Sequence, residues 1–210
     1  MPLYPVNLKV DGRHCTVIGG GRVALRKVES LLECGAEVKL VTPFIDEGFE
    51  ALHGRFEHVA RPYRWGDLEG SFLVIAATDD NTTNRAVEEE ARARHLLLNV
   101  VDKPEQCNFF VPATIRRGEL MLTMSTGGEL PALAKRLRLQ LEEEFPQEWS
   151  QALVLLGKAR RRVLAQFRDE RRKQECLGEL AGLDLVGVLK AGGDIAAQAE
   201  IDRCISRYLA

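Results

Sequence analysis

The sequence predicts an α/β protein in which an N-terminal Rossmann-type parallel sheet is followed by a small α+β segment and a C-terminal helical domain. Near its start, a glycine-rich turn joins an apolar strand to an amphipathic helix. Further apolar runs of strand length end in polar residues, as in strands that are buried on both faces. Beyond residue 145 the pattern becomes entirely helical. We therefore expect domains over 1–112, 113–145 and 146–210.

The composition is that of a soluble globular protein, with 45% hydrophobic and 29% charged residues. A net charge of −2 gives no overall attraction to nucleic acid or to a membrane. No leader and no bilayer-spanning apolar run is evident, so we expect a cytoplasmic protein. Five cysteines without a C-x-x-C pair and four histidines without ligand spacing predict neither a disulfide framework nor a metal site.

The glycine-rich turn has the spacing of a dinucleotide-binding motif. A strand over 15–18 leads into Gly19, Gly21 and Ala24, which fill the G-x-G-x-x-G/A pattern, and a helix follows over 22–34. Phosphates would bind at the positive N-terminus of that helix. The alternative interpretation is a purely structural tight turn. The residues predicted to hold the cofactor here are Gly19, Gly20, Gly21, Arg22 and Val23.

The second strand, over 37–41, bears on the choice of cofactor. An acidic residue at its end would hold the adenosine ribose, but Thr42 and Pro43 stand there instead. The Thr42 hydroxyl can take that role, and no arginine stands beside it to hold a 2′-phosphate. We therefore predict that Thr42 and Pro43 line a site for NAD rather than NADP.

A second buried strand is expected over 71–77, and it ends in a polar cluster. Thr78 and Asp80 can cap the next helix, over 83–95, or can line the cofactor crevice together with Ala77. Both interpretations remain open at this point. Between the second strand and this one we expect a short helix over 44–52, a weak strand over 56–60 and a loop over 61–70.

The next apolar strand, over 96–101, brings Asp102 to the carboxyl edge of the sheet, where open parallel sheets bind their ligands. Asp102 is therefore either a turn residue or a functional group. Extended segments over 109–112 and 120–125 should flank a turn at 116–118.

A second helix N-terminus follows, at the start of a helix that runs to residue 144. Ser125, Thr126, Gly127 and Gly128 precede Pro131, so hydroxyls and exposed amides could hold a carboxylate. A simple helix cap is the alternative. Further helices are expected over 149–170 and 195–209. Residues 158 to 173 include eight basic residues but only two acidic ones. This excess of positive charge predicts either a solvated helix face or a surface that binds a polyanion.

Four motifs, taken in order, resemble those of the precorrin-2 dehydrogenase family, the dehydrogenase and ferrochelatase module of siroheme synthases. They are 17–24 with Arg26 and Lys27, 76–80, 99–102, and 125–128 with Pro131. The resemblance covers nearly the whole chain. It implies NAD-dependent oxidation of precorrin-2 to sirohydrochlorin in siroheme biosynthesis, a homodimer formed through 113–145, and an essential aspartate at Asp102. Some members also insert Fe²⁺, an activity that the resemblance leaves open.

This chemistry agrees with the residues. Dehydrogenation removes a hydride, which nicotinamide accepts, and a proton, for which an ionised aspartate such as Asp102 can be the base. Precorrin-2 carries many carboxylates, which suits an anion site. The residues predicted to bind this substrate are Ser125, Thr126, Gly127, Gly128, Arg116 and Lys135.

Two further expectations complete the prediction. Because the sequence ends at Ala210, the methyltransferase domain of larger siroheme synthases is not expected, and another protein would supply methylation. A regulatory module that senses NAD(H) without catalysis is the alternative function.

Overall fold

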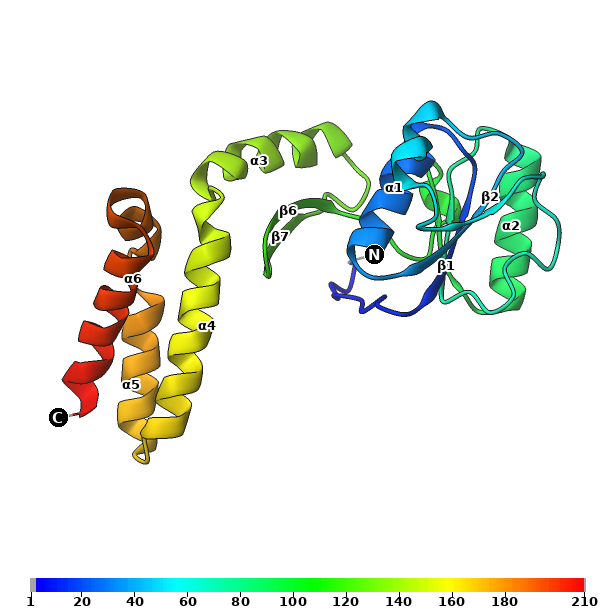
Figure 1. Cartoon of the computed structure of the whole chain (residues 1–210). Coiled ribbons are helices and arrows are strands. Elements are labelled where there is room, and N and C mark those ends of the chain that lie inside the picture. The colour runs from blue at the N-terminus through cyan, green and yellow to red at the C-terminus, as the bar shows by residue number, and fades with distance from the viewer. Residues whose placement is uncertain (1–2, 210) are drawn as a thin grey trace. The chain divides into compact units, whose positions relative to one another are not determined.

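The computed structural model describes residues 3–209 and forms two compact units, one up to Val111 and one from Pro112 (Figure 1). The first unit is built on one parallel sheet with strand order β3-β2-β1-β4-β5. Its strands are β1 (His14–Ile18), β2 (Glu37–Val41), β3 (Glu57–Val59), β4 (Leu73–Ala76) and β5 (Leu97–Val100). The order reverses between β1 and β4, so the predicted Rossmann-type sheet is confirmed.

Helices cover both faces of this sheet (Figure 1). On one face, α1 (Arg22–Glu33) packs its buried Ala24 and Val28 against Val17 and Leu40. On the other, α2 (Asn81–Ala93) packs Val87 and Ala91 against alternate strand residues such as Val74 and Val100. Because successive strand side chains point to opposite faces, both sets of apolar residues are needed, and the strands read as continuous apolar runs.

The predicted loop over 61–70 is tied to α2 by a buried carboxylate. Glu90 is fully buried and accepts hydrogen bonds from the Tyr63 hydroxyl (2.5 Å) and the Gly66 amide (2.9 Å). The Arg94 Nε donates to it as well (2.8 Å). A buried carboxylate is expensive unless it is paired in this way, so this network fixes the loop on the helix.

The second unit starts with a two-stranded antiparallel sheet, β6 (Ala113–Arg117) and β7 (Leu120–Met124), and continues with helices only. Its helical core is formed by buried residues that include Leu155, Cys176, Leu180, Ile201 and Cys204. The helices are α3 (Pro131–Glu144), α4 (Glu148–Gln166), α5 (Glu170–Ala181) and α6 (Leu185–Leu209), the last of which is kinked at Gly193.

Two predicted elements of the second half were wrong. The extended segment predicted over 109–112 lies before the paired strands, since strand pairing begins at Ala113. The turn lies at Gly118, whose φ of +59° suits glycine, while Arg116 and Arg117 remain in β6. The helix predicted over 149–170 ends at Gln166, because Asp169 caps a separate helix by accepting from the Arg172 amide (2.8 Å).

Two predicted helices of the first unit have different bounds. The helix expected over 44–52 is shortened to a 3₁₀ turn, η1 (Glu47–Leu52), capped by the Asp46 side chain. The helix expected over 83–95 begins two residues earlier, at Asn81, because Asp80 is its N-cap. A second 3₁₀ turn, η2 (Pro104–Gln106), follows β5.

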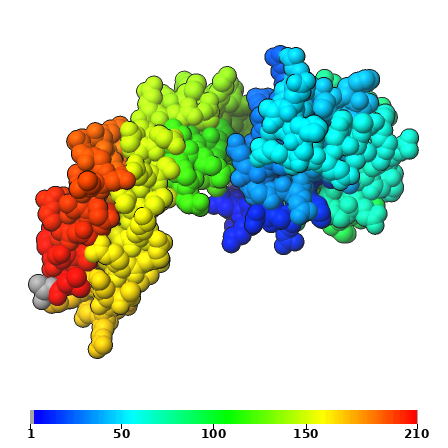
Figure 2. All heavy atoms as spheres, in the orientation of Figure 1, coloured from blue at the N-terminus to red at the C-terminus, as the bar shows by residue number. Residues whose placement is uncertain are grey.

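The stretch before β1 lies on the surface of the first unit, where it is dark blue in Figure 2. Its side chains Tyr4 and Val6 are exposed. Within residues 3–209, no helix combines the length and the apolar character that crossing a bilayer requires.

Candidate functional site

The predicted cofactor residues and Asp102 all lie at one edge of the first unit's sheet. We call this edge, formed by the residues that follow the carboxyl ends of β1, β2, β4 and β5, the cofactor crevice. It contains the reversal of strand order between β1 and β4. In open parallel sheets, ligands bind at this position.

Gly19 and Gly20 make the turn after β1 possible. Gly19 has a φ of +110°, and a side-chain carbon there would overlap with the carbonyl oxygen of Ala77. At Gly20, such a carbon would overlap with the carbonyl oxygen of Phe44. The turn is therefore packed directly against the ends of β4 and β2, and both positions require glycine for a structural reason.

Gly21 differs, because a side-chain carbon there would meet no atom within 4 Å. It is the N-cap of α1, and neither a capping side chain nor an acidic residue occupies the first turn of that helix. The first intrahelical hydrogen bond runs from the Leu25 amide to the Gly21 carbonyl (3.0 Å). The preceding amides, including those of Arg22 and Val23, thus have no acceptor in the helix. This open, positive helix terminus can hold a phosphate.

The chain after β2 folds back onto the glycine turn. Thr42 is buried, and its hydroxyl donates a hydrogen bond to the Phe44 carbonyl (2.8 Å) that helps to fix the loop. Pro43 is exposed. The Asp46 amide donates to the Gly20 carbonyl (2.8 Å). One Asp46 carboxylate oxygen accepts from the Gly48 amide (3.0 Å), and the other lies 3.7 Å from Arg22 Nε.

Asp46 is a candidate residue that the sequence analysis missed. It follows the end of β2 by five residues, whereas the usual position for a ribose-binding acid, directly after the strand, holds Thr42 and Pro43. The loop brings it beside the glycine turn nonetheless. The available signal was the Asp46-x-Gly48 pair, which is typical of a side chain that caps a tight turn.

At the end of β4, Asp80 caps α2 and shapes the wall of the crevice. Its carboxylate accepts from the amides of Thr82 (3.0 Å) and Thr83 (3.2 Å) and from the Thr83 hydroxyl (2.6 Å). These contacts, the Thr83 hydroxyl first, hold the pKa of Asp80 below its usual value. The Thr78 hydroxyl accepts from the Asp80 amide (3.1 Å). The capping interpretation of the sequence is thus confirmed.

Asn84, in the first turn of α2, holds the same turn at Thr78. It is buried, and its amide group donates to the Thr78 carbonyl (3.0 Å). Its side-chain oxygen has no hydrogen-bond partner among the described residues. Together with Ala77, whose amide donates to the Ile18 carbonyl (2.7 Å), it fixes the crevice between β1 and β4.

Asp102 stands in a tight turn just after β5, and its side chain is exposed. Its φ is +59°, a left-handed conformation that few residues other than glycine adopt. The Val101 amide before it donates to the Ala76 carbonyl (2.9 Å), and the Lys103 amide after it donates to the Val100 carbonyl (3.2 Å). A strained residue at a ligand-binding edge is a candidate for function.

The predicted substrate residues belong to the second unit. Thr126 accepts from the Leu130 amide (3.2 Å) and Ser125 from the Gly127 amide (3.2 Å), so both hydroxyls keep a proton to donate. Gly127 and Gly128 have φ values of +65° and +90°, and a side-chain carbon at either position would meet no atom within 4 Å. Arg116, on β6, and Lys135, in the first turns of α3, are exposed cations of the same unit.

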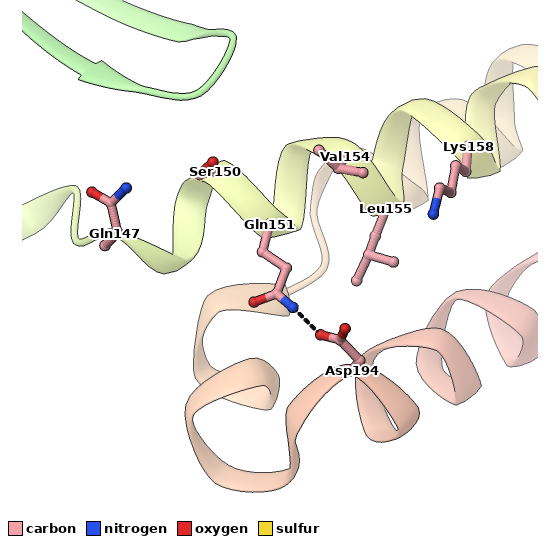
Figure 3. Close-up of a pocket in the computed structure, with 7 residues that line it drawn as sticks. All are labelled: Gln147, Ser150, Gln151, Val154, Leu155, Lys158 and Asp194. Carbon is pink, nitrogen blue, oxygen red and sulfur yellow. Dashed lines mark hydrogen bonds between the residues drawn. The ribbon is translucent and has the colours of Figure 1, made fainter.

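A cavity of about 420 Å³ in the second unit contains none of these residues. It lies along α4 and is closed on one side by Asp194, which follows the kink in α6 (Figure 3). Gln151 and Asp194 point toward each other and form a hydrogen bond.

Among residues 3–209, the side chains that could bind a metal ion are dispersed. Within the described chain, no three His, Cys, Asp or Glu side chains are grouped as a metal ion would require. The five cysteines, all within the described residues, form no disulfide with one another.

Comparison with known proteins gives a family match for the first unit and relatives for the whole chain. Residues 6–113 match a family model described as "Putative NAD(P)-binding". The siroheme synthase of Methylobacillus flagellatus is 39% identical over 169 residues, which are 80% of this chain and 36% of that protein. The siroheme synthase of Thioalkalivibrio sulfidiphilus is 34% identical over 211 residues, covering 100% of this chain and 43% of that protein. The chain therefore spans less than half the length of these relatives.

A solved structure matches over nearly the entire chain. It is that of SirC, precorrin-2 dehydrogenase, with a TM-score of 0.79 and 27% sequence identity. The match covers 98% of this chain and 100% of the other, so it includes both units.

Proposed function

The chain belongs to the family of precorrin-2 dehydrogenases and the corresponding region of siroheme synthases, and on that premise we propose that it oxidises precorrin-2 to sirohydrochlorin with NAD⁺. One observation carries the proposal. An uncapped helix N-terminus opens at the same sheet edge that presents the strained Asp102.

The residues of the crevice fit a dinucleotide. The open space at Gly21 leaves room for a pyrophosphate, which the amides of Arg22 and Val23 would bind. The walls formed by Thr42, Pro43, Ala77, Thr78 and Asp80 would hold the two ends of the cofactor. The nicotinamide, when bound, accepts a hydride.

The preference for NAD over NADP is supported by Asp46. In Rossmann folds an acid beyond the second strand binds the ribose 2′-hydroxyl, and Asp46 lies beside the glycine turn on that side. A 2′-phosphate would bring a second negative charge close to its carboxylate. The Arg22 guanidinium already faces this carboxylate, with its Nε 3.7 Å from an Asp46 oxygen.

Asp102 would act as the base. Its exposed carboxylate can take the proton that leaves the tetrapyrrole while the hydride leaves in the other direction. In the second unit, Ser125, Thr126, Gly127 and Gly128 would donate to substrate carboxylates, and Arg116 and Lys135 would pair with them.

A homodimer is part of the proposal. A two-stranded sheet such as β6–β7 is marginally stable by itself, and both of its outer edges lack a neighbouring strand within the described chain. A second copy that adds strands here would satisfy those edges.

An anaerobic assay with precorrin-2, run with NAD⁺ and NADP⁺ side by side, tests the function. We expect formation of NADH and of sirohydrochlorin, with NAD⁺ preferred. A protein that binds NAD⁺ but never oxidises the tetrapyrrole would favour the sensing function. Adding Fe²⁺ to the product, with and without protein, measures whether iron insertion is accelerated.

A further inference from the structure

The turn of Asp102 is flanked by one cysteine thiol that contacts the backbone on both of its sides. Cys107 Sγ lies 3.2 Å from the carbonyl oxygen of Val100 and 3.2 Å from that of Lys103. It also accepts from the Val100 amide at 3.2 Å. The two carbonyls belong to the residues that begin and end the turn. The thiol therefore spans the turn in which Asp102 takes its left-handed conformation.

The thiol is itself fixed against β5, the edge strand of the sheet. Next to it, the Asn108 side chain accepts from the Leu98 amide (2.8 Å) and donates to the Leu96 carbonyl (2.8 Å). The Asn99 side chain donates to the Phe109 carbonyl (3.1 Å). These bonds hold the segment after Cys107 against the free edge of β5. The segment before Cys107 is bonded to the turn itself, because the Gln106 amide donates to the Lys103 carbonyl (3.0 Å).

The thiol is also suited to donate. Burial raises the pKa of Cys107, so the sulfur keeps its proton at neutral pH. The single thiol proton of Cys107 is shared between the carbonyls of Val100 and Lys103, while a sulfur lone pair accepts from the Val100 amide.

We propose that Cys107 is a positioning residue, whose thiol holds the Val100 and Lys103 carbonyls and thereby keeps the Asp102 carboxylate at the cofactor crevice. This inference rests on the proposed function of Asp102 as the base. Without the thiol, the turn keeps only its backbone bonds, such as the one from the Lys103 amide to the Val100 carbonyl, and the carboxylate is less well aligned with the substrate.

The first test compares Cys107→Val, which removes the donor at similar size, with Cys107→Ser, which keeps one. We expect Cys107→Val to lower kcat about tenfold or more with an unchanged KM for NAD⁺, because misplacing a catalytic group mainly affects the chemical step. Cys107→Ser should recover most of the loss. Cys34→Ser, at the far end of α1, is the matched control and should retain wild-type kcat.

Hydrogen exchange at the Lys103 amide tests the contact without relying on activity. This amide bonds to Val100 across the turn, so Cys107→Val should speed its exchange while amides in β1 are unaffected. In an Asp102→Asn background, Cys107→Val should cause no further loss of turnover.

The possible failures are distinguishable. If Asp102→Asn abolishes turnover but Cys107→Val keeps wild-type kcat, the positioning role is overturned and the proposed function stands. If the wild-type protein does not oxidise the substrate, the proposed function fails. Unchanged exchange at Lys103 in Cys107→Val overturns the thiol contact in either case.

Discussion

Gly19 and Gly21 lie two residues apart but are constrained in different ways. Gly19 has no room for a side chain because the end of β4 packs against it, whereas Gly21 faces open space. The first is therefore required by the fold and the second by the ligand that we propose. The same motif thus combines two separate physical requirements.

Alanine substitution separates these requirements. Gly19→Ala should destabilise the protein by about 1–3 kcal/mol or more, because the added carbon overlaps with Ala77 and the backbone is left-handed. Gly21→Ala should leave the free energy of unfolding nearly unchanged but weaken NAD⁺ binding at least about tenfold, since the carbon takes the space of a pyrophosphate. Denaturant unfolding and calorimetric titration measure both. Equal NAD⁺ affinity of Gly21→Ala and wild type would contradict the proposed phosphate site.

Asp46 supports the proposed preference for NAD over NADP. Asp46→Asn keeps an acceptor for the Gly48 amide but removes the charge that would repel a 2′-phosphate. We expect the affinity for NADP⁺ relative to NAD⁺ to rise about tenfold, as measured by titration with each cofactor. Glu69→Gln, an exposed neutralisation in the 61–70 loop, is the control. An unchanged ratio in Asp46→Asn would show that the carboxylate does not face the ribose.

At the scale of single elements, the strands and the helices that follow them were largely predictable. The buried strands are continuous apolar runs, so their positions can be predicted from the sequence. The runs 71–77 and 96–101 contain β4 and β5, respectively. The break between α4 and α5 was not predictable from a glycine or proline. It depends on Asp169 as a cap and on burial of Phe167, which is a tertiary contact.

The site was predictable only where local sequence defines it. The glycine turn and the cap at Asp80 are local patterns and were found. Asp46 and Cys107 reach the crevice through loops whose paths depend on contacts with Gly20 and β5. The Asp46-x-Gly48 spacing indicates a capped turn, but it does not indicate where that turn lies.

Because Asp80 caps α2 with an ionised carboxylate, the stability of the protein should depend on pH. The folded protein holds the pKa of Asp80 below its unfolded value, so this cap stabilises above the unfolded value, near pH ~3.9, and the stabilisation is lost as pH falls through the folded pKa. Asp80→Asn keeps a capping side chain that does not titrate. Urea unfolding should therefore show wild type losing stability relative to Asp80→Asn as pH falls from about 5 to about 2. A stability difference that stays constant over this range would contradict the role of the ionised cap.

At the scale of the whole molecule, the proposal requires two copies of the chain. Sedimentation equilibrium should give a mass twice the 23.4 kDa of one chain, because pairing of β6–β7 edges buries strand edges that one copy leaves open. A dilution series serves as the control, since a true dimer dissociates only at low concentration. A mass of one chain at micromolar concentration would contradict the dimer.

The central claim is that the sheet edge that would bind the cofactor also supplies the base. Asp102→Asn tests it most directly, because asparagine tolerates the left-handed backbone and changes only the carboxylate. We predict that anaerobic turnover of precorrin-2 falls about 10²–10⁴-fold while NAD⁺ affinity stays at the wild-type value. Wild-type turnover in Asp102→Asn would contradict the account.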